Sequence, residues 1–98
     1  MSAPPLFPLG KLLATPGALQ ALAESGENPV QFLDRHINGD WGEVDANDGQ
    51  MNDEAVKDGS RILSIYQTAK GVRIWIITEA ADDSGSRSAT TILLPNEY

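Results

Sequence analysis

Arg35-His36-Ile37-Asn38-Gly39-Asp40-Trp41-Gly42 is the stretch on which the organisation of the whole chain depends. It holds the only histidine and one of the two tryptophans, and it lies where an apolar helical pattern stops and an acidic segment begins. At a helix end the dipole favours a histidine as imidazolium, and Asp40, one turn on, can pair with His36. Gly39 can end the helix, and Trp41 can fill the bend. We therefore interpret the stretch as the joint between two parts of the fold.

Two short helices are predicted before this joint. Thr15-Pro16 and Asn28-Pro29 each combine a side chain that can cap free backbone N–H groups with a proline at the first helical position. They predict helices over residues 16–24 and 29–37, which should pack as a hairpin because neither is long enough to be stable alone. The expected apolar faces are Ala18, Leu19, Leu22 and Ala23 in the first helix, and Val30, Leu33 and Ile37 in the second, with Phe32 and His36 beside the latter.

A third helix is indicated after the joint. Either Asn47 or Asp48 could cap its N-terminus, and Gly59 would end it. Its narrow apolar stripe would comprise Met51, Ala55 and Val56. Such a helix would carry several of the acidic residues of the chain.

The pattern then changes from helix to strand. Lys70-Gly71 marks a turn, and residues 82–87 form a polar, turn-forming segment. Trp75 lies inside an apolar strand and is expected in the core. Residues 10–14 form a short apolar link that can serve as an edge strand. Three segments rich in β-branched and aromatic residues predict the strands of an antiparallel meander: residues 61–67, 72–79 and 89–94.

The order of these elements predicts an α+β fold, in which two to three short N-terminal helices pack on a three-stranded antiparallel β-meander. A chain of 98 residues fits a single domain. We expect an extended proline-rich arm over residues 1–9, a helical half over residues 10–59 and an antiparallel sheet over residues 60–98.

Composition limits the classes of function. The chain has no cysteine, no long apolar run and a start interrupted by prolines, so we expect a cytoplasmic protein without disulfides or a membrane span. A formal charge of −7 opposes non-specific binding to phosphate backbones and would attract a basic protein. We therefore expect a protein partner, and neither direct nucleic-acid binding nor a membrane partner. No cofactor is expected, and a lone histidine cannot supply the two ligands of a His-based metal motif.

The acidic segment from Asp40 to Asp58 is the strongest candidate for a binding surface. It carries seven acids and one lysine, and carboxylates spaced along a helix could stand in for phosphates. A calcium loop that starts at Glu43 fits in part, but Asp48 stands where a glycine must make the sharp turn, so no metal site is assigned. The candidate binding residues are Asp40, Trp41, Glu43, Asp45, Asp48, Asp53, Glu54 and Asp58.

A small toxin-like ribonuclease is one alternative. His36 could act as acid or base, with Arg61 or Arg73 stabilising a phosphate and Tyr66 on the same sheet. This comparison is an analogy of element order only, so no catalytic residue is assigned. A homodimeric structural or regulatory protein, paired through a sheet edge or through the apolar arm, is the other alternative.

Several segments of the chain are specific in combination. They are Thr15-Pro16-Gly17-Ala18-Leu19, Arg35-His36, Gly39-Asp40-Trp41-Gly42, Arg61-Ile62-Leu63-Ser64 with Tyr66, Trp75-Ile76-Ile77-Thr78-Glu79, and Thr90-Thr91-Ile92-Leu93-Leu94-Pro95 with Tyr98. Together they resemble a family of small bacterial proteins of plasmids and other mobile elements, whose members carry names such as plasmid-related protein or type I restriction subunit. The resemblance spans nearly all of residues 10–98 and implies a mobile-element setting but no catalytic residue. Residues 82–87 depart from the family pattern as a longer hairpin tip.

The leading hypothesis is therefore a small acidic interaction protein of mobile genetic elements. It would bind a basic or nucleic-acid-handling protein partner, for example as an anti-restriction or anti-CRISPR-like inhibitor that mimics the charge of nucleic acid. The adjacent acidic surface, rather than the joint at residues 35–42, is the expected site.

Overall fold

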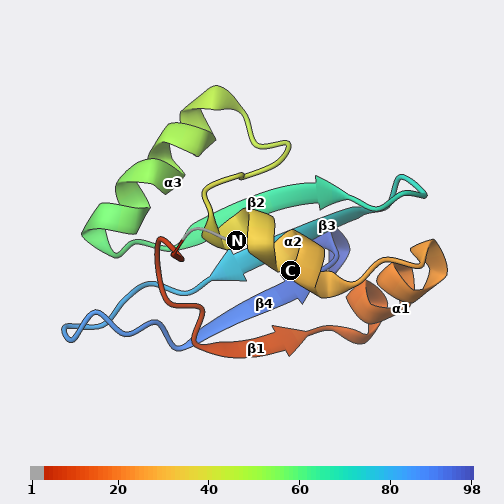
Figure 1. Cartoon of the computed structure of the whole chain (residues 1–98), viewed down its shortest axis with the longest axis horizontal. Helices are drawn as coiled ribbons and strands as arrows, with labels where there is room; N and C mark the ends of the chain where they lie inside the picture. The colour runs from red at the N-terminus through yellow and green to blue at the C-terminus, as the bar shows by residue number, and fades with distance from the viewer. Residues whose placement is uncertain (1–3) are drawn as a thin grey trace.

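The computed structural model describes residues 4–98, so the expectation for the start of the arm, residues 1–3, lies outside the described residues. Figure 1 shows α2 crossing one face of a sheet, with α3 beside the edge formed by β2. None of the helices in this part of the chain is long and apolar enough to cross a membrane. The helices are α1 (Pro16–Ser25), α2 (Pro29–Ile37), α3 (Ala46–Asp58) and the short 3-10 helix η1 (Pro95–Glu97). The strands are β1 (Lys11–Ala14), β2 (Ile62–Gln67), β3 (Arg73–Thr78) and β4 (Ala89–Leu93).

The two predicted helices before the joint are confirmed, and their caps explain where they begin. The side chains of Thr15 and Asn28 each accept a hydrogen bond from a backbone N–H of the first helical turn. α1 ends at Gly26, whose φ of 70° is left-handed and suits glycine. Local sequence signals are therefore sufficient to place both helices.

The third helix is also present, but its cap differs from the prediction. The cap is Asp45, whose carboxylate accepts a hydrogen bond from the Asp48 N–H, rather than Asn47 or Asp48 itself. Gly59 ends the helix as predicted. Because the chain is helical from residue 46 onward, it cannot wrap an ion in the manner of an EF-hand loop.

The buried faces of α1 and α2 are rotated from the predicted faces. Phe32, Leu33 and His36 form the buried side of α2, whereas Val30 is exposed. Leu19 of α1 is exposed as well. Ala18 and Leu22 of α1 and Phe32 and Leu33 of α2 lie in one core cluster with the sheet.

The sheet is four-stranded and mixed, so the prediction of a three-stranded antiparallel meander is wrong in that respect. The strand order is β1-β4-β3-β2, and the meander of β2, β3 and β4 is antiparallel as predicted. β1 runs parallel to β4, with Leu12 opposite Thr90. This pairing joins segments that are far apart in the sequence, and local patterns do not encode it. The helical half therefore contains a strand, and η1 follows the sheet, so the helices are not all N-terminal.

The two faces of the sheet pack differently. On the face covered by α1 and α2, the main core includes Tyr66, Ile74, Ile76 and Ile92. Trp75 is half-buried on the opposite face, where its ring centroid lies 5.6 Å from that of Tyr98, so its predicted place in the core is wrong. We call this opposite face the outer face, and its side chains are Leu63, Ile65, Trp75, Ile77, Thr91 and Leu93.

The edge of β2 is covered by the segment after α2 and by α3. The Ile65 N–H donates to the Trp41 carbonyl at 3.0 Å, in a bridge that pairs Ile65 with Gly42. A Cβ at Gly42 would lie 1.9 Å from the Ile65 carbonyl oxygen, so only glycine fits there. The Asn52 amide donates to the Leu63 carbonyl at 2.7 Å and accepts from the Leu63 N–H at 3.2 Å. This side chain pairs with the edge as a neighbouring strand would.

The described part of the predicted arm, residues 4–9, docks on the fold. Phe7 is buried, stacks on Trp41 with ring centroids 6.2 Å apart, and meets the edge of the His36 ring at 5.3 Å. The Leu6 N–H also donates to the Ile37 carbonyl at 2.9 Å. The arm therefore covers the joint.

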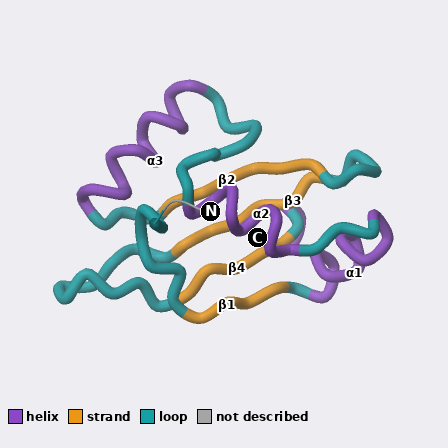
Figure 2. Tube along the Cα trace, viewed as in Figure 1, coloured by secondary structure: helices purple, strands orange, loops and turns teal. Residues whose placement is uncertain are grey.

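The long loop between β3 and β4 projects past the strand ends (Figure 2). Near its end, the side chain of Arg87 is buried and anchors the loop to the fold. The guanidinium of Arg87 donates to the carbonyls of Ala55, Ser60 and Glu79 at 2.8 to 3.0 Å. Arg87 thus joins the end of α3 to β2 and β3, although the sequence placed it with the polar hairpin tip.

Replacing Asn52 with alanine should lower the free energy of unfolding by about 1 to 3 kcal/mol, because both backbone groups of Leu63 lose their partner. Urea unfolding followed by circular dichroism measures the loss. Asn47→Ala is the matched control, since Asn47 is exposed on the same helix and gains the same helix propensity. Equal stability of the two variants would contradict the role of Asn52 at the edge.

Candidate functional site

His36 is fully buried in the middle of a chain of side-chain hydrogen bonds. Its Nδ1 lies 2.6 Å from Ser64 Oγ, and its Nε2 lies 2.8 Å from Thr78 Oγ1. Thr78 Oγ1 is 2.7 Å from Thr90 Oγ1, which donates to the Leu9 carbonyl at 2.7 Å. The chain joins α2, three strands and the arm in one network.

The direction of this hydrogen-bond chain determines the tautomer of the histidine. Each hydroxyl has a single proton to donate. Because Thr90 donates to Leu9, it accepts from Thr78, and Thr78 in turn accepts from the Nε2–H of His36. The hydrogen-bond chain therefore places a proton on Nε2. Burial favours the neutral ring, in which Nδ1 carries no proton and accepts from the Ser64 hydroxyl.

Burial, and after it the charge of Arg87, lowers the pKa of His36 from 6.5 to about 4. The expectation of an imidazolium at the helix end is wrong, because the cost of burying the charged ring exceeds the benefit of the helix dipole. Asp40 does not pair with His36 and instead accepts from Arg35 Nε at 2.8 Å, a contact that lowers the pKa of the Asp40 carboxyl. A neutral ring without solvent contact cannot reach a substrate.

The structure does not bring the ribonuclease candidates together. The hydroxyl of Tyr66 donates to the Asp40 carbonyl beneath Arg35, and burial raises the pKa of Tyr66 to about 12. Arg61 and Arg73 lie at opposite ends of the pair formed by β2 and β3. His36, Tyr66 and the two arginines share no cleft, so the geometry gives the ribonuclease alternative no support.

Five of the eight predicted binding residues bind another side chain or cap a helix, and a sixth, Asp58, accepts a hydrogen bond from Ser60 close by in the chain. Trp41 is only 7 % exposed, and its Nε1 donates to Asp53 at 3.0 Å. Three other carboxylates bind partners in the chain: Asp40 binds Arg35, Asp45 caps α3, and Glu43 pairs with Arg73 at 3.6 Å. The acidic segment is therefore partly structural, and three of its carboxylates remain for another role.

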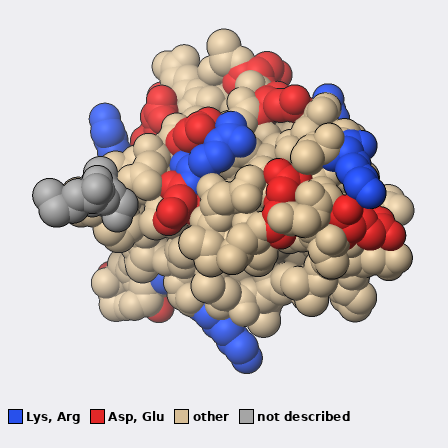
Figure 3. Space-filling view, turned by 45° about the vertical axis from the view of Figure 1, so that its right-hand side comes forward, with Lys and Arg blue, Asp and Glu red and all other residues tan. Residues whose placement is uncertain are grey.

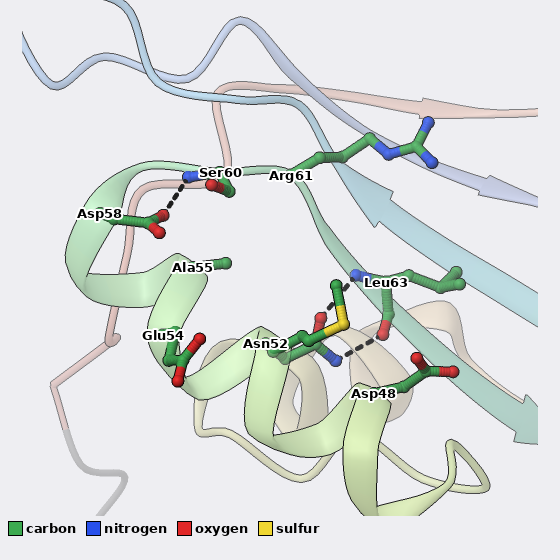
Figure 4. Close-up of a pocket in the computed structure, with 9 residues that line it drawn as sticks. Asp48, Asn52, Glu54, Ala55, Asp58, Ser60, Arg61 and Leu63 are labelled. Atoms are coloured by element: carbon green, nitrogen blue, oxygen red, sulfur yellow. Dashed lines mark hydrogen bonds between the residues drawn. The ribbon is translucent and has the colours of Figure 1, made fainter.

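Asp48, Glu54 and Asp58 line a groove of about 330 Å³ between α3 and the start of β2 (Figure 4). Asp48, Met51, Ala55 and Asp58 lie on the side of α3 that faces the groove, because successive members of this set are three or four residues apart. We call this hollow the acidic groove, and it is defined by Asp48, Met51, Glu54, Asp58, Arg61 and Leu63.

Within the described part of the chain, the ion pairs join Arg35 to Asp40 and Arg73 to Glu43, so the carboxylates of the groove have no cation partner. Hydrogen bonds from Ser60, and less strongly the charge of Arg87, lower the pKa of Asp58. Figure 3 shows acidic side chains in separate groups with basic ones between them. Negative charge is therefore concentrated in separate patches of the surface. In the acidic groove, the carboxylates can hold a cationic group next to the apolar side chains of Met51 and Leu63.

Two parts of the groove were missed in the sequence. Met51, a member of the predicted narrow apolar stripe of α3, is 58 % exposed, and Leu63, predicted only as part of a strand, also lines the groove. No local signal could have found them, because the groove exists only where α3 lies beside β2.

Comparisons with known proteins give no relative: no protein-family model, no curated protein and no solved structure matches this chain. The resemblance to mobile-element proteins therefore stays a prediction.

Acid should destabilise the fold through His36. Its pKa is about 4 in the folded state and near 6.5 in the unfolded state, so between these values the unfolded state binds more protons. The stability that His36 contributes is complete above about pH 6.5 and falls by about 3 kcal/mol as the pH drops to about 4. Urea unfolding of the wild type at a series of pH values measures this loss.

His36→Gln is the control for the carboxylates, which titrate alike in both proteins. The stability difference between wild type and variant should shrink from pH 7 to pH 4 by that amount. A constant difference would show that the fold does not shift the pKa of His36, and a difference that grows as the pH falls would show a raised pKa; either result would contradict the buried neutral ring.

Proposed function

We propose that this chain is a small acidic interaction protein that binds a cationic segment of a partner protein in the acidic groove. The observation that carries the proposal is that Asp48, Glu54 and Asp58 surround one hollow without a cation partner. Carboxylates that share a hollow with low-dielectric walls concentrate their field on it, and so attract a cation more strongly than dispersed charges do. His36 is removed from the surface, which leaves the groove as the best candidate site.

The groove combines charge with apolar surface. Met51 is exposed beside Leu63, and a flexible thioether adapts to apolar groups of different shape. At 1.5 Å per residue, the helix places Asp48 and Asp58 about 15 Å apart, a span that about four or five extended residues would cover. The groove therefore suits a short segment in which Lys or Arg residues flank an apolar side chain.

The partner class that we infer is a basic or nucleic-acid-handling protein. The net charge of −7 would steer such a protein toward this chain. The mobile-element setting implied by the resemblance favours a restriction or CRISPR defence complex, whose inhibition would rest on carboxylates in the place of phosphates.

A homodimeric structural or regulatory protein is the second candidate. β1 forms one edge of the sheet, and its Leu12 and Leu13 are exposed. A strand of four residues that carries Lys11 is poorly suited to pairing, and such an edge alone offers less area than a stable dimer needs. Light scattering over a concentration series separates the two candidates, and we expect a monomer throughout.

Removing the three groove charges should weaken binding of a basic peptide. We expect the triple variant Asp48→Asn, Glu54→Gln, Asp58→Asn to bind a fluorescent Lys-Lys-Leu-Lys-Lys peptide about tenfold more weakly than the wild type at low salt, since each exposed charge pair contributes a modest amount. Fluorescence anisotropy gives the affinities, and circular dichroism checks the fold.

The matched control is the triple variant Glu24→Gln, Asp34→Asn, Asp83→Asn, which removes the same net charge at exposed positions away from the groove. Capture from a bacterial lysate with all three proteins extends the test to natural partners, identified by mass spectrometry. Basic proteins that are retained by wild type and control but not by the groove variant would support the proposal. Equal losses of peptide affinity in both triple variants would contradict it.

A further inference from the structure

Tyr98 lies over the outer face of the sheet, between Trp75 and Arg61. Its ring centroid is 5.6 Å from that of Trp75, and the Arg61 guanidinium lies 5.5 Å from the centre of the Tyr98 ring. Arg61 Nη1 also donates to the Tyr98 hydroxyl at 2.5 Å. Tyr98 is 67 % exposed, so these contacts to Trp75 and Arg61 are its main attachment to the sheet.

Arg61 is the basic member of the set of residues that line the acidic groove. Figure 4 shows its side chain extended over the sheet, away from Asp58 and Glu54. The arginine side chain is long and flexible enough to turn toward carboxylates that line the same hollow. Arg61 is thus the nearest competitor for any cation that enters the groove.

We propose that Tyr98, supported by Trp75, is a positioning residue that holds Arg61 on the outer face and so keeps the groove carboxylates free for a cationic partner. The consequence for binding rests on the proposed function. The position of Arg61 itself does not, because it can be measured without a partner.

The two positions open to Arg61, against Tyr98 on the outer face and beside a groove carboxylate, are close in free energy. An exposed ion pair and an exposed cation–π contact are both weak and of similar strength. Removing the hydrogen bond and the ring together should therefore shift Arg61 from the outer face to Asp58 or Glu54. Removing the hydroxyl alone, in Tyr98→Phe, keeps the ring contacts and should shift Arg61 only in part.

Nuclear Overhauser effects locate the Arg61 side chain in the complete chain. We expect contacts between its side-chain protons and the Tyr98 ring in the wild type, weaker ones in Tyr98→Phe, and contacts with Asp58 or Glu54 in Tyr98→Ala. The backbone amide spectrum confirms that each variant is folded. Arg61 that lies away from Tyr98 in the wild type, or stays on the outer face in Tyr98→Ala, would overturn the proposal.

Affinity for the Lys-Lys-Leu-Lys-Lys peptide tests the consequence. Tyr98→Ala should bind about two- to fivefold more weakly than wild type, the size of one exposed ion pair, and adding Arg61→Gln should restore the affinity. A double variant as weak as Tyr98→Ala would show that Arg61 is not the competitor and would overturn the positioning role. If the peptide binds none of the proteins while Arg61 still moves as expected, the positioning is supported and the proposed function fails.

Discussion

The hydrogen-bond chain through His36 is the interaction on which the rest of this structure depends. It runs from Ser64 through the imidazole to Thr78, Thr90 and the Leu9 carbonyl, entirely inside the fold. A buried polar chain is stabilising only when every member has a partner, and within residues 4–98 no buried side-chain nitrogen or oxygen lacks one. The neutral, Nε2-protonated ring satisfies this condition without burying a charge, whereas an imidazolium at this fully buried position would carry one. The chain therefore fixes both the protonation of His36 and the packing of α2 on the sheet.

This arrangement also decides where function can lie. The arm and Trp41 cover His36, and the end of the joint, at Trp41 and Gly42, pairs with the edge of β2. Several carboxylates of the acidic segment are used to hold these parts in place. The carboxylates of the acidic segment that are left at the surface line the groove between α3 and β2, and they have no cation partner within the described chain. These carboxylates stay unpaired only while Arg61 lies away from them, and the contacts of Arg61 with Tyr98, which packs on Trp75, hold it on the outer face.

The sequence predicted the features that local chemistry controls. Thr15-Pro16 and Asn28-Pro29 gave two helices, and the alternation after residue 60 gave three antiparallel strands. The features that it did not reveal depend on residues distant in the chain. The parallel pairing of β1 with β4 has no local signature, and the face of α2 is set by polar partners on the sheet, which draw His36 inward and leave Val30 outside. The acidic segment was recognised as a candidate surface, but only tertiary placement separates Asp48, Glu54 and Asp58 from the carboxylates that the fold uses.

The ¹⁵N chemical shifts of the His36 ring, followed from pH 8 to pH 4, test most directly whether His36 is a structural joint. The account predicts a protonated Nε2 and an unprotonated Nδ1 at neutral pH, with no change until the pH approaches about 4. Ring nitrogens that average between tautomers and titrate near 6.5 would show a solvated histidine, and would contradict the buried chain and the assignment of function to the groove.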